Sequence, residues 1–158
     1  TGNVYFIEHF KGVRDMKLYL NATTKGQALK EKLLSFLVAK GHDVVDLTSS
    51  EDGDDVFKVT QQTVMKIQSD LESKAIIVDD YGIAPFIIAN KYKHIICASV
   101  SDEQSSKMTR RHNNTNIIVL GSEIIGATLV QNCADAFFKA DYDAGRHQIR
   151  IDMLNHMC

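Results

Sequence analysis

The sequence predicts an α/β fold, a Rossmann-like three-layer α/β/α sandwich with a five-stranded parallel sheet. From residue 16 onward, short runs rich in β-branched residues alternate with longer stretches whose apolar residues recur at helical spacing. The clearest strand candidate, residues 74–80 (KAIIVDD), is continuously apolar up to its two aspartates, as expected for a strand covered on both faces. A helix between each pair of consecutive strands implies right-handed crossovers and a parallel sheet.

The expected elements follow one another in regular alternation. The predicted strands are residues 17–22, 42–47, 74–80, 94–100 and 116–121. The predicted helices are residues 25–41, 56–73, 84–93, 101–112 and 122–140, and a final helix begins near Arg146. Because ligands of such sheets bind beyond the carboxyl ends of the strands, the candidate ligand-binding segments are residues 21–26, 79–84, 99–103 and 121–123.

Length and composition restrict the possible functions. The 158 residues suit one domain, residues 16–158, preceded by an N-terminal extension, residues 1–15, that is either vector-encoded or an extra element packed on the domain. A formal net charge of −2 gives no field for a long polyanion, so we expect no nucleic-acid partner. No apolar run approaches the roughly 20 residues that span a bilayer. The three cysteines lack disulfide or metal spacing, which favours a cytoplasmic protein.

Two adjacent carboxylates, Asp79 and Asp80, end the third predicted strand. Such a pair could hold a metal ion or accept a phosphoryl group, as in receiver domains. A receiver needs further acidic residues after its first strand, where this chain has residues 21–23 (NAT). The structural alternative is that one aspartate caps the following helix while Gly82 permits the turn.

His112 lies between a polar predicted helix and the fifth strand. An imidazole is the side chain best suited to proton transfer near neutral pH, so His112 is a candidate catalytic residue. The alternative is an ordinary surface or capping histidine.

The last segment, residues 143–158, concentrates polar groups. Arg146 and Arg150 are four residues apart, so on a helix they share one face and could bind a phosphate, while His147 and Gln148 project elsewhere. The alternative is a solvated basic stripe paired with nearby aspartates. Apolar residues on the same helix indicate that it packs against a surface, which is a neighbouring subunit if the helix leaves its own domain.

Four segments together resemble one family, that of ribose-5-phosphate isomerase B and galactose-6-phosphate isomerase. They are residues 25–33 (KGQALKEKL), 81–91 (YGIAPFIIANK), 101–126 and 145–154 (GRHQIRIDML). The resemblance implies a doubly wound fold, dimers or tetramers, and interconversion of phosphorylated aldoses and ketoses without a cofactor or metal. A histidine opens the sugar ring, and a base moves a proton between C1 and C2 while backbone amides of a glycine-rich loop stabilise the enediolate.

The resemblance assigns roles to four residues of this chain. His112 matches the ring-opening histidine and Asn113 the asparagine beside it. Arg146 and Arg150 match the arginines that hold the substrate phosphate.

The other half of the family's site is altered here. The Asp-His pair after the first strand falls on residues 23–24 (TT). The base loop, commonly Cys-Gly-Thr-Gly-x-Gly, aligns with residues 79–84, so Asp79 replaces the cysteine base, and Asp80 and Tyr81 replace the next two positions. Side chains in place of glycine hinder close backbone approach to a substrate. Glu123 stands where some relatives have an arginine.

This asymmetry resembles the A-type subunits of heteromeric galactose-6-phosphate isomerases, which pair with a B-type subunit that keeps the cysteine loop. The resemblance implies a composite site that interconverts D-galactose 6-phosphate and D-tagatose 6-phosphate in lactose catabolism. One alternative is a self-sufficient isomerase, a homodimer or tetramer that uses Asp79 or Asp80 as its base. Another is a non-catalytic subunit that senses sugar phosphate or supports assembly.

Overall fold

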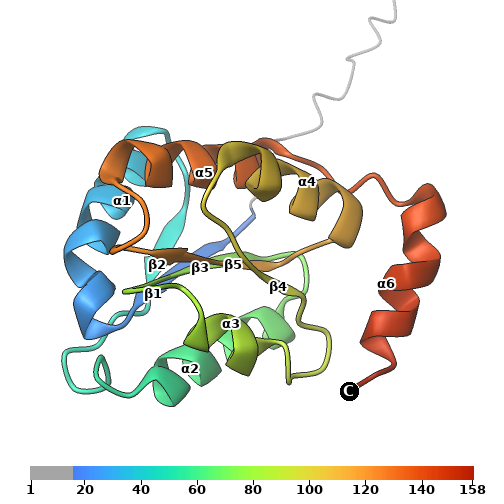
Figure 1. Ribbon diagram of the computed structural model, residues 1–158, viewed down its shortest axis with the longest axis horizontal. Coiled ribbons are helices and arrows are strands. Elements are labelled where there is room, and N and C mark those ends of the chain that lie inside the picture. Colours follow the sequence, from blue (N-terminus) through green and yellow to red (C-terminus); the bar gives the residue numbers. More distant parts are fainter. Residues whose placement is uncertain (1–15) are drawn as a thin grey trace, which may run out of the picture.

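The computed structural model describes residues 16–158, in which a five-stranded sheet lies between two layers of helices (Figure 1). The sheet order is β2-β1-β3-β5-β4, and all four pairings are parallel. This confirms the predicted fold class; the expected extension, residues 1–15, lies outside the described residues. The strands are β1 (Leu18–Ala22), β2 (Val44–Asp46), β3 (Lys74–Asp79), β4 (Cys97–Ser99) and β5 (Ile117–Gly121).

Helices cover both faces of the sheet, with α1, α4 and α5 on one face and α2 and α3 on the other (Figure 1). A final helix, α6, stands at the side of the domain beyond β4 (Figure 1). Within residues 16–158 no helix has the length and apolar character needed to cross a membrane. The α-helices are α1 (Gln27–Ala39), α2 (Val56–Ser69), α3 (Ala84–Ala89), α4 (Glu103–Asn113), α5 (Ala127–Lys139) and α6 (Gln148–Asn155); short 3₁₀ helices are η1 (Thr24–Gly26) and η2 (Gly145–His147).

Strand β3 has a continuous apolar run because it contributes to two hydrophobic cores. Ile76 and Val78 join the core beneath α1 and α5, whereas Ala75 and Ile77 join the core beneath α2 and α3. Side chains of a strand alternate between faces, so a strand covered on both sides needs apolar residues at every position. The sequence pattern therefore identified the centre of the sheet.

The loops at the carboxyl edge of the sheet are held by backbone contacts. Gly82 has a φ of +74°, and a side chain there would approach the backbone of Gly121 to within 3.1 Å. The backbone N–H groups of Ser122 and Glu123 donate to the carbonyls of Asp79 and Asp80, at 2.7 and 2.8 Å. Residues 122–125 then form a turn, and Gly126 is extended, with a ψ of 174°, so α5 begins at Ala127 and not at residue 122, where the sequence predicts it.

Candidate active site

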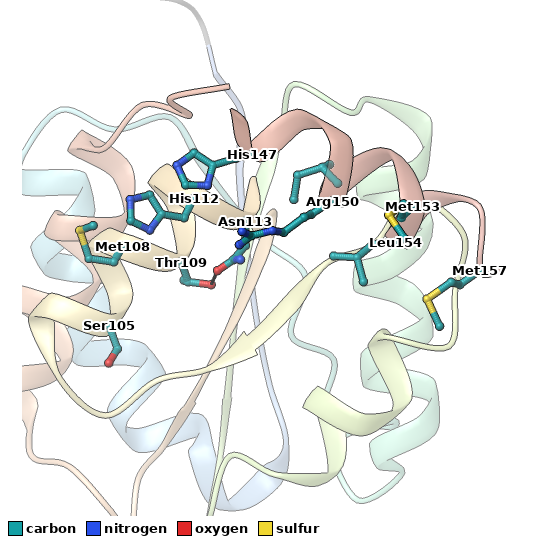
Figure 2. A pocket seen from close by; sticks show the side chains of 11 residues that line it. Ser105, Met108, Thr109, His112, Asn113, His147, Arg150, Met153, Leu154 and Met157 are labelled. Atoms are coloured by element: carbon teal, nitrogen blue, oxygen red, sulfur yellow. Dashed lines mark hydrogen bonds between the residues drawn. The ribbon is translucent and has the colours of Figure 1, made fainter. Parts of the chain in front are cut away.

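A cavity of about 610 Å³ opens between α4 and the C-terminal segment (Figure 2). Its volume lies within the range typical of small-molecule sites, about 300–1,000 Å³. The α4 side contributes Ser105, Met108, Thr109, His112 and Asn113, and the C-terminal side contributes His147, Arg150, Ile151, Met153, Leu154 and Met157. Three of the four residues that the resemblance assigns to the site, His112, Asn113 and Arg150, therefore line one cavity.

His112, near the end of α4, is stacked on a second histidine. The ring centroids of His112 and His147 are 4.4 Å apart, and the rings are inclined by 16°. Desolvation lowers the pKa of His147, and the positive charges near it, on His112, Arg146 and Arg150, lower it further. A neutral His147 imidazole is thus favoured beside the candidate catalytic ring.

The sequence prediction that His147 projects away from the site is wrong, because the helix does not extend through Arg146. Ala144 and Gly145 have positive φ values, 52° and 58°, and the chain then forms the 3₁₀ helix η2 before α6 begins at Gln148. A 3₁₀ turn has about three residues per turn, so the expected four-residue spacing does not hold across this junction. His147 and Arg150 line the cavity, whereas Arg146 is exposed and lies outside its lining.

An ion pair fastens this C-terminal segment to α4. The Arg111 Nε donates to Asp143 Oδ1 at 3.1 Å, and the second oxygen of Asp143 lies 3.0 Å from an Arg111 terminal nitrogen. The Asp143 backbone N–H also donates to the Arg111 carbonyl at 2.9 Å. The hydrogen bond from Arg111 holds the pKa of Asp143 below its usual value. These contacts attach the segment one residue before His112.

Asn113 is the last residue of α4, at the point where the chain turns toward β5. Its Oδ1 accepts a hydrogen bond from the Thr109 hydroxyl at 3.2 Å, and Asn114 ends the helix in the left-handed conformation, with a φ of 54°. Asn113 and Arg150 both extend into the space between the two helices (Figure 2). Their polar groups can bind substrate hydroxyl and phosphate oxygens respectively.

The altered base loop lies elsewhere and is largely engaged in internal contacts. Asp79 is buried, at 7% exposure, and its carboxylate accepts a hydrogen bond from the Thr23 hydroxyl at 2.7 Å. The Tyr81 N–H donates to Asp80 Oδ1 at 2.8 Å, and this hydrogen bond is the main cause of the lowered pKa of Asp80. The positive charge of Lys25, whose Nζ lies 3.6 Å from Asp80, lowers that pKa further. Tyr81 is exposed, as is Glu123, which follows β5.

The base-loop residues and His112 lie at opposite ends of the strands, the former at their carboxyl ends (the carboxyl edge of the sheet) and the latter at their amino ends (the amino edge). Asp79 is the last residue of β3 and pairs in register with Gly121, the last residue of β5. His112 precedes the first residue of β5, Ile117, because α4 returns the chain to the amino edge. At about 3.3 Å per residue, β5 alone separates the two edges by about 13 Å.

Comparisons with known proteins agree with this architecture. The Ribose/Galactose Isomerase family matches residues 18–154. A galactose-6-phosphate isomerase subunit LacA from Lactococcus lactis is 44% identical over 143 residues, which are 90% of this chain and 100% of that protein. The corresponding subunit from Staphylococcus haemolyticus is 46% identical over the same shares of the two chains.

Solved structures show the same fold. A ribose 5-phosphate isomerase from Thermotoga maritima matches with a TM-score of 0.84 and 30% identity over 89% of this chain and 98% of its own. Ribose-5-phosphate isomerase B from Mycoplasma genitalium, solved with bound ribulose-5-phosphate, matches with a TM-score of 0.85 and 26% identity over 90% and 95%. The chain belongs to the Ribose/Galactose Isomerase family of aldose–ketose isomerases.

Proposed function

We propose that this chain is one subunit of a heteromeric, cytoplasmic isomerase that interconverts D-galactose 6-phosphate and D-tagatose 6-phosphate. It supplies His112 as the ring-opening residue and Asn113, Arg146 and Arg150 as substrate-binding residues. A B-type subunit supplies the base and the amide-lined loop. The relatives of 43–46% identity, which are named as LacA subunits of galactose-6-phosphate isomerase, support this choice of substrate and partner.

In this reaction the cyclic hemiacetal opens to the free aldehyde, and the His112 imidazole transfers the proton that this opening requires. The partner's base then takes the proton from C2 and returns it to C1, through an enediolate, which converts the aldose to the ketose. The guanidinium groups of Arg150 and Arg146 hold the phosphate and keep the sugar in register with the base. Asn113 binds a hydroxyl of the opened chain.

The observation that carries the proposal is the separation of the two half-sites. His112 and Arg150 line one cavity between α4 and α6, with His112 at the end of α4 that leads into the amino end of β5, whereas Asp79 ends β3 at the carboxyl edge and Asp80 follows it. A proton shuttle works at hydrogen-bond distance, about 3 Å, so one copy of this chain cannot use both halves on one sugar. A second chain must bring its own carboxyl-edge loop to this cavity.

The internal contacts of Asp79 and Asp80 disfavour these carboxylates as bases. Asp79 is buried and bonded to Thr23, and the lowered pKa of Asp80 makes it a weaker base. The self-sufficient isomerase is therefore the less supported of the two enzymatic alternatives.

Two exposed apolar surfaces support assembly with a partner. On α6, the side chains of Ile149, Met153 and Leu154 are exposed, and the last two also line the cavity. At the carboxyl edge, Tyr81, Ile83 and Ile124 are exposed as well. A family dimer that joins an α6 surface to a carboxyl-edge surface buries both and closes the cavity over the substrate.

Reconstitution of the heteromer from its purified subunits tests this function. The purified chain is combined with a B-type subunit that keeps the cysteine loop, and conversion of D-galactose 6-phosphate to D-tagatose 6-phosphate is followed. Turnover that appears only in the mixture supports the proposal. A mixture that assembles from folded chains and yet converts no D-galactose 6-phosphate contradicts it, and turnover by this chain alone would favour the self-sufficient alternative.

A further inference from the structure

We propose that His112, His147 and Asp143 form a binding site for a divalent transition-metal ion, with Zn²⁺ as the ion whose chemistry fits these donors. One ligand atom from each residue lies within 4.8 Å of the other two. Two imidazole nitrogens and one carboxylate oxygen are a common three-residue donor set for zinc, which leaves the fourth position open. Neither the family match nor the expected reaction assigns a metal to these residues.

The distances require a small adjustment of the two rings. Zinc binds imidazole nitrogen at about 2.0–2.1 Å, so two nitrogens of a tetrahedral site lie about 3.3 Å apart. The rings of His112 and His147 are stacked at an inclination of only 16°, so their in-plane lone pairs lie in two nearly parallel, separate planes. Both rings must tilt for the lone pairs to converge on one ion, so metal binding and ring stacking exclude each other.

The carboxylate is already oriented for the site. Arg111 donates to one oxygen of Asp143 at 3.1 Å, and an Arg111 terminal nitrogen lies 3.0 Å from the other oxygen. Each carboxylate oxygen retains a lone pair for a metal. A ligand held by an outer hydrogen-bonding partner loses less freedom on binding, and such partners typically change metal affinity by about 10–100-fold. Arg111 is the outer hydrogen-bonding partner of the Asp143 carboxylate.

The donor types select the ion. Imidazole favours zinc, nickel and copper, whereas Mg²⁺ and Ca²⁺ prefer sites made of oxygen ligands alone. The neighbouring charges of Arg146 and Arg150 oppose any cation, which favours the ions that bind imidazole most strongly. Mg²⁺ is therefore a matched negative control.

This site overlaps the substrate cavity, a consequence that rests on the proposed function. A nitrogen of His112 that binds zinc cannot also move the ring-opening proton. Zinc should then inhibit the assembled isomerase, and saturating sugar phosphate should relieve the inhibition. Binding itself needs neither a partner nor turnover, so it can be tested even if the proposed reaction proves wrong.

The test is calorimetric titration of the full chain with ZnCl₂ and with MgCl₂, at about pH 7.5, where an ordinary imidazole is neutral. We expect one zinc site that weakens roughly tenfold or more in both His147→Asn and Asp143→Asn, and no magnesium binding. His94→Asn, which alters an exposed histidine outside the cluster, serves as the control and should bind zinc as the unchanged chain does.

Because Asp143→Asn also weakens the contact with Arg111, imidazole NMR gives a second measurement on the unchanged chain. Zinc should shift the ring signals of His112 and His147 together. Unchanged affinity in His147→Asn, or zinc-dependent shifts confined to other histidines, would overturn the proposal. Zinc binding that leaves the turnover of an active heteromer unaffected would overturn the overlap with the substrate site.

Discussion

The imidazole rings of His112 and His147 stack at a centroid distance of 4.4 Å, which joins the end of α4 to the start of the C-terminal segment at the candidate active site. His147 thus contacts the ring proposed to carry the chemistry. Its role can be separated into a packing part and an electrostatic part, because other flat side chains can also stack.

We predict that His147→Phe retains more turnover of the assembled isomerase than His147→Ala, since phenylalanine preserves a flat surface against His112. In metal-free buffer, NMR titration should give His147 a pKa below the ordinary value of about 6.5, because its surroundings are desolvating and cationic. In His112→Ala that pKa should rise toward the ordinary value. Equal turnover in the two His147 variants would exclude a packing role.

Loss of the Arg111–Asp143 pair should loosen the C-terminal segment more than it destabilises the whole protein. The Arg111 and Asp143 side chains are 39% and 33% exposed, so water screens the pair, and Arg111→Gln should change the unfolding free energy only slightly. Hydrogen exchange of α6 amides should nevertheless accelerate, and the KM for the sugar phosphate should rise.

The matched control for Arg111→Gln is Lys139→Gln, which removes an exposed ion pair between Lys139 and Asp135 within α5. Hydrogen exchange of the α6 amides should not change in Lys139→Gln. Faster α6 exchange in both variants would mean that the Arg111 contact has no specific anchoring role.

The buried cation Lys30 makes folding depend on Asp46. The Lys30 residue is 2% exposed, and its Nζ lies 2.8 Å from Asp46 and 2.6 Å from Glu31. Burial alone would lower the pKa of Lys30, but the hydrogen bonds to Asp46 and Glu31 outweigh burial, so the pKa of Lys30 is raised. Burial alone would raise the pKa of Asp46, but the hydrogen bond from Lys30 and those from Thr48 outweigh it, so the pKa of Asp46 is lowered.

Asp46→Asn should therefore reduce the unfolding free energy by about 2 kcal/mol at neutral pH, measured by urea titration. Because the folded pKa of Asp46 is below its unfolded value, its contribution is present above the unfolded pKa and is lost as pH falls through the folded pKa. The difference between the original chain and the variant should thus shrink in acid. A difference that grows in acid would contradict this assignment.

The apolar face of α6 should matter for assembly and not for folding. Ile149 is 70% exposed, so Ile149→Asp should leave the melting temperature of the isolated chain nearly unchanged while it prevents formation of the heteromer. Met65→Asp, at a position 66% exposed on α2, is the matched control and should assemble normally. The mass of each mixture, measured by light scattering, distinguishes the two outcomes.

Much of the fold was predictable because its signals are local. The apolar run before Asp79 and the helical spacing between strands predicted the parallel sheet, and the structure confirms them. The start of α5 was not predictable from periodicity, since residues 122–125 instead form a turn whose Ser122 and Glu123 N–H groups bond to Asp79 and Asp80. Contacts between loops that are distant in sequence leave no periodic signal.

The site was only partly predictable, for a similar reason. The resemblance assigned His112, Asn113 and Arg150, which the structure brings to one cavity. It did not identify His147, because spacing arguments assume an unbroken helix and the chain instead forms the turn η2 after Ala144. A non-glycine residue at positive φ is a tertiary feature that the sequence alone does not signal.

Turnover of the heteromer with variants of this chain only shows whether catalysis uses this chain's His112 and another chain's base. His112→Gln should reduce kcat by about a hundredfold or more, since general acid–base catalysis typically contributes about 10²–10⁴-fold. Asp79→Asn, which can keep the hydrogen bond from Thr23, should leave kcat nearly unchanged. Full turnover with His112→Gln, or its loss with Asp79→Asn, would contradict a composite site.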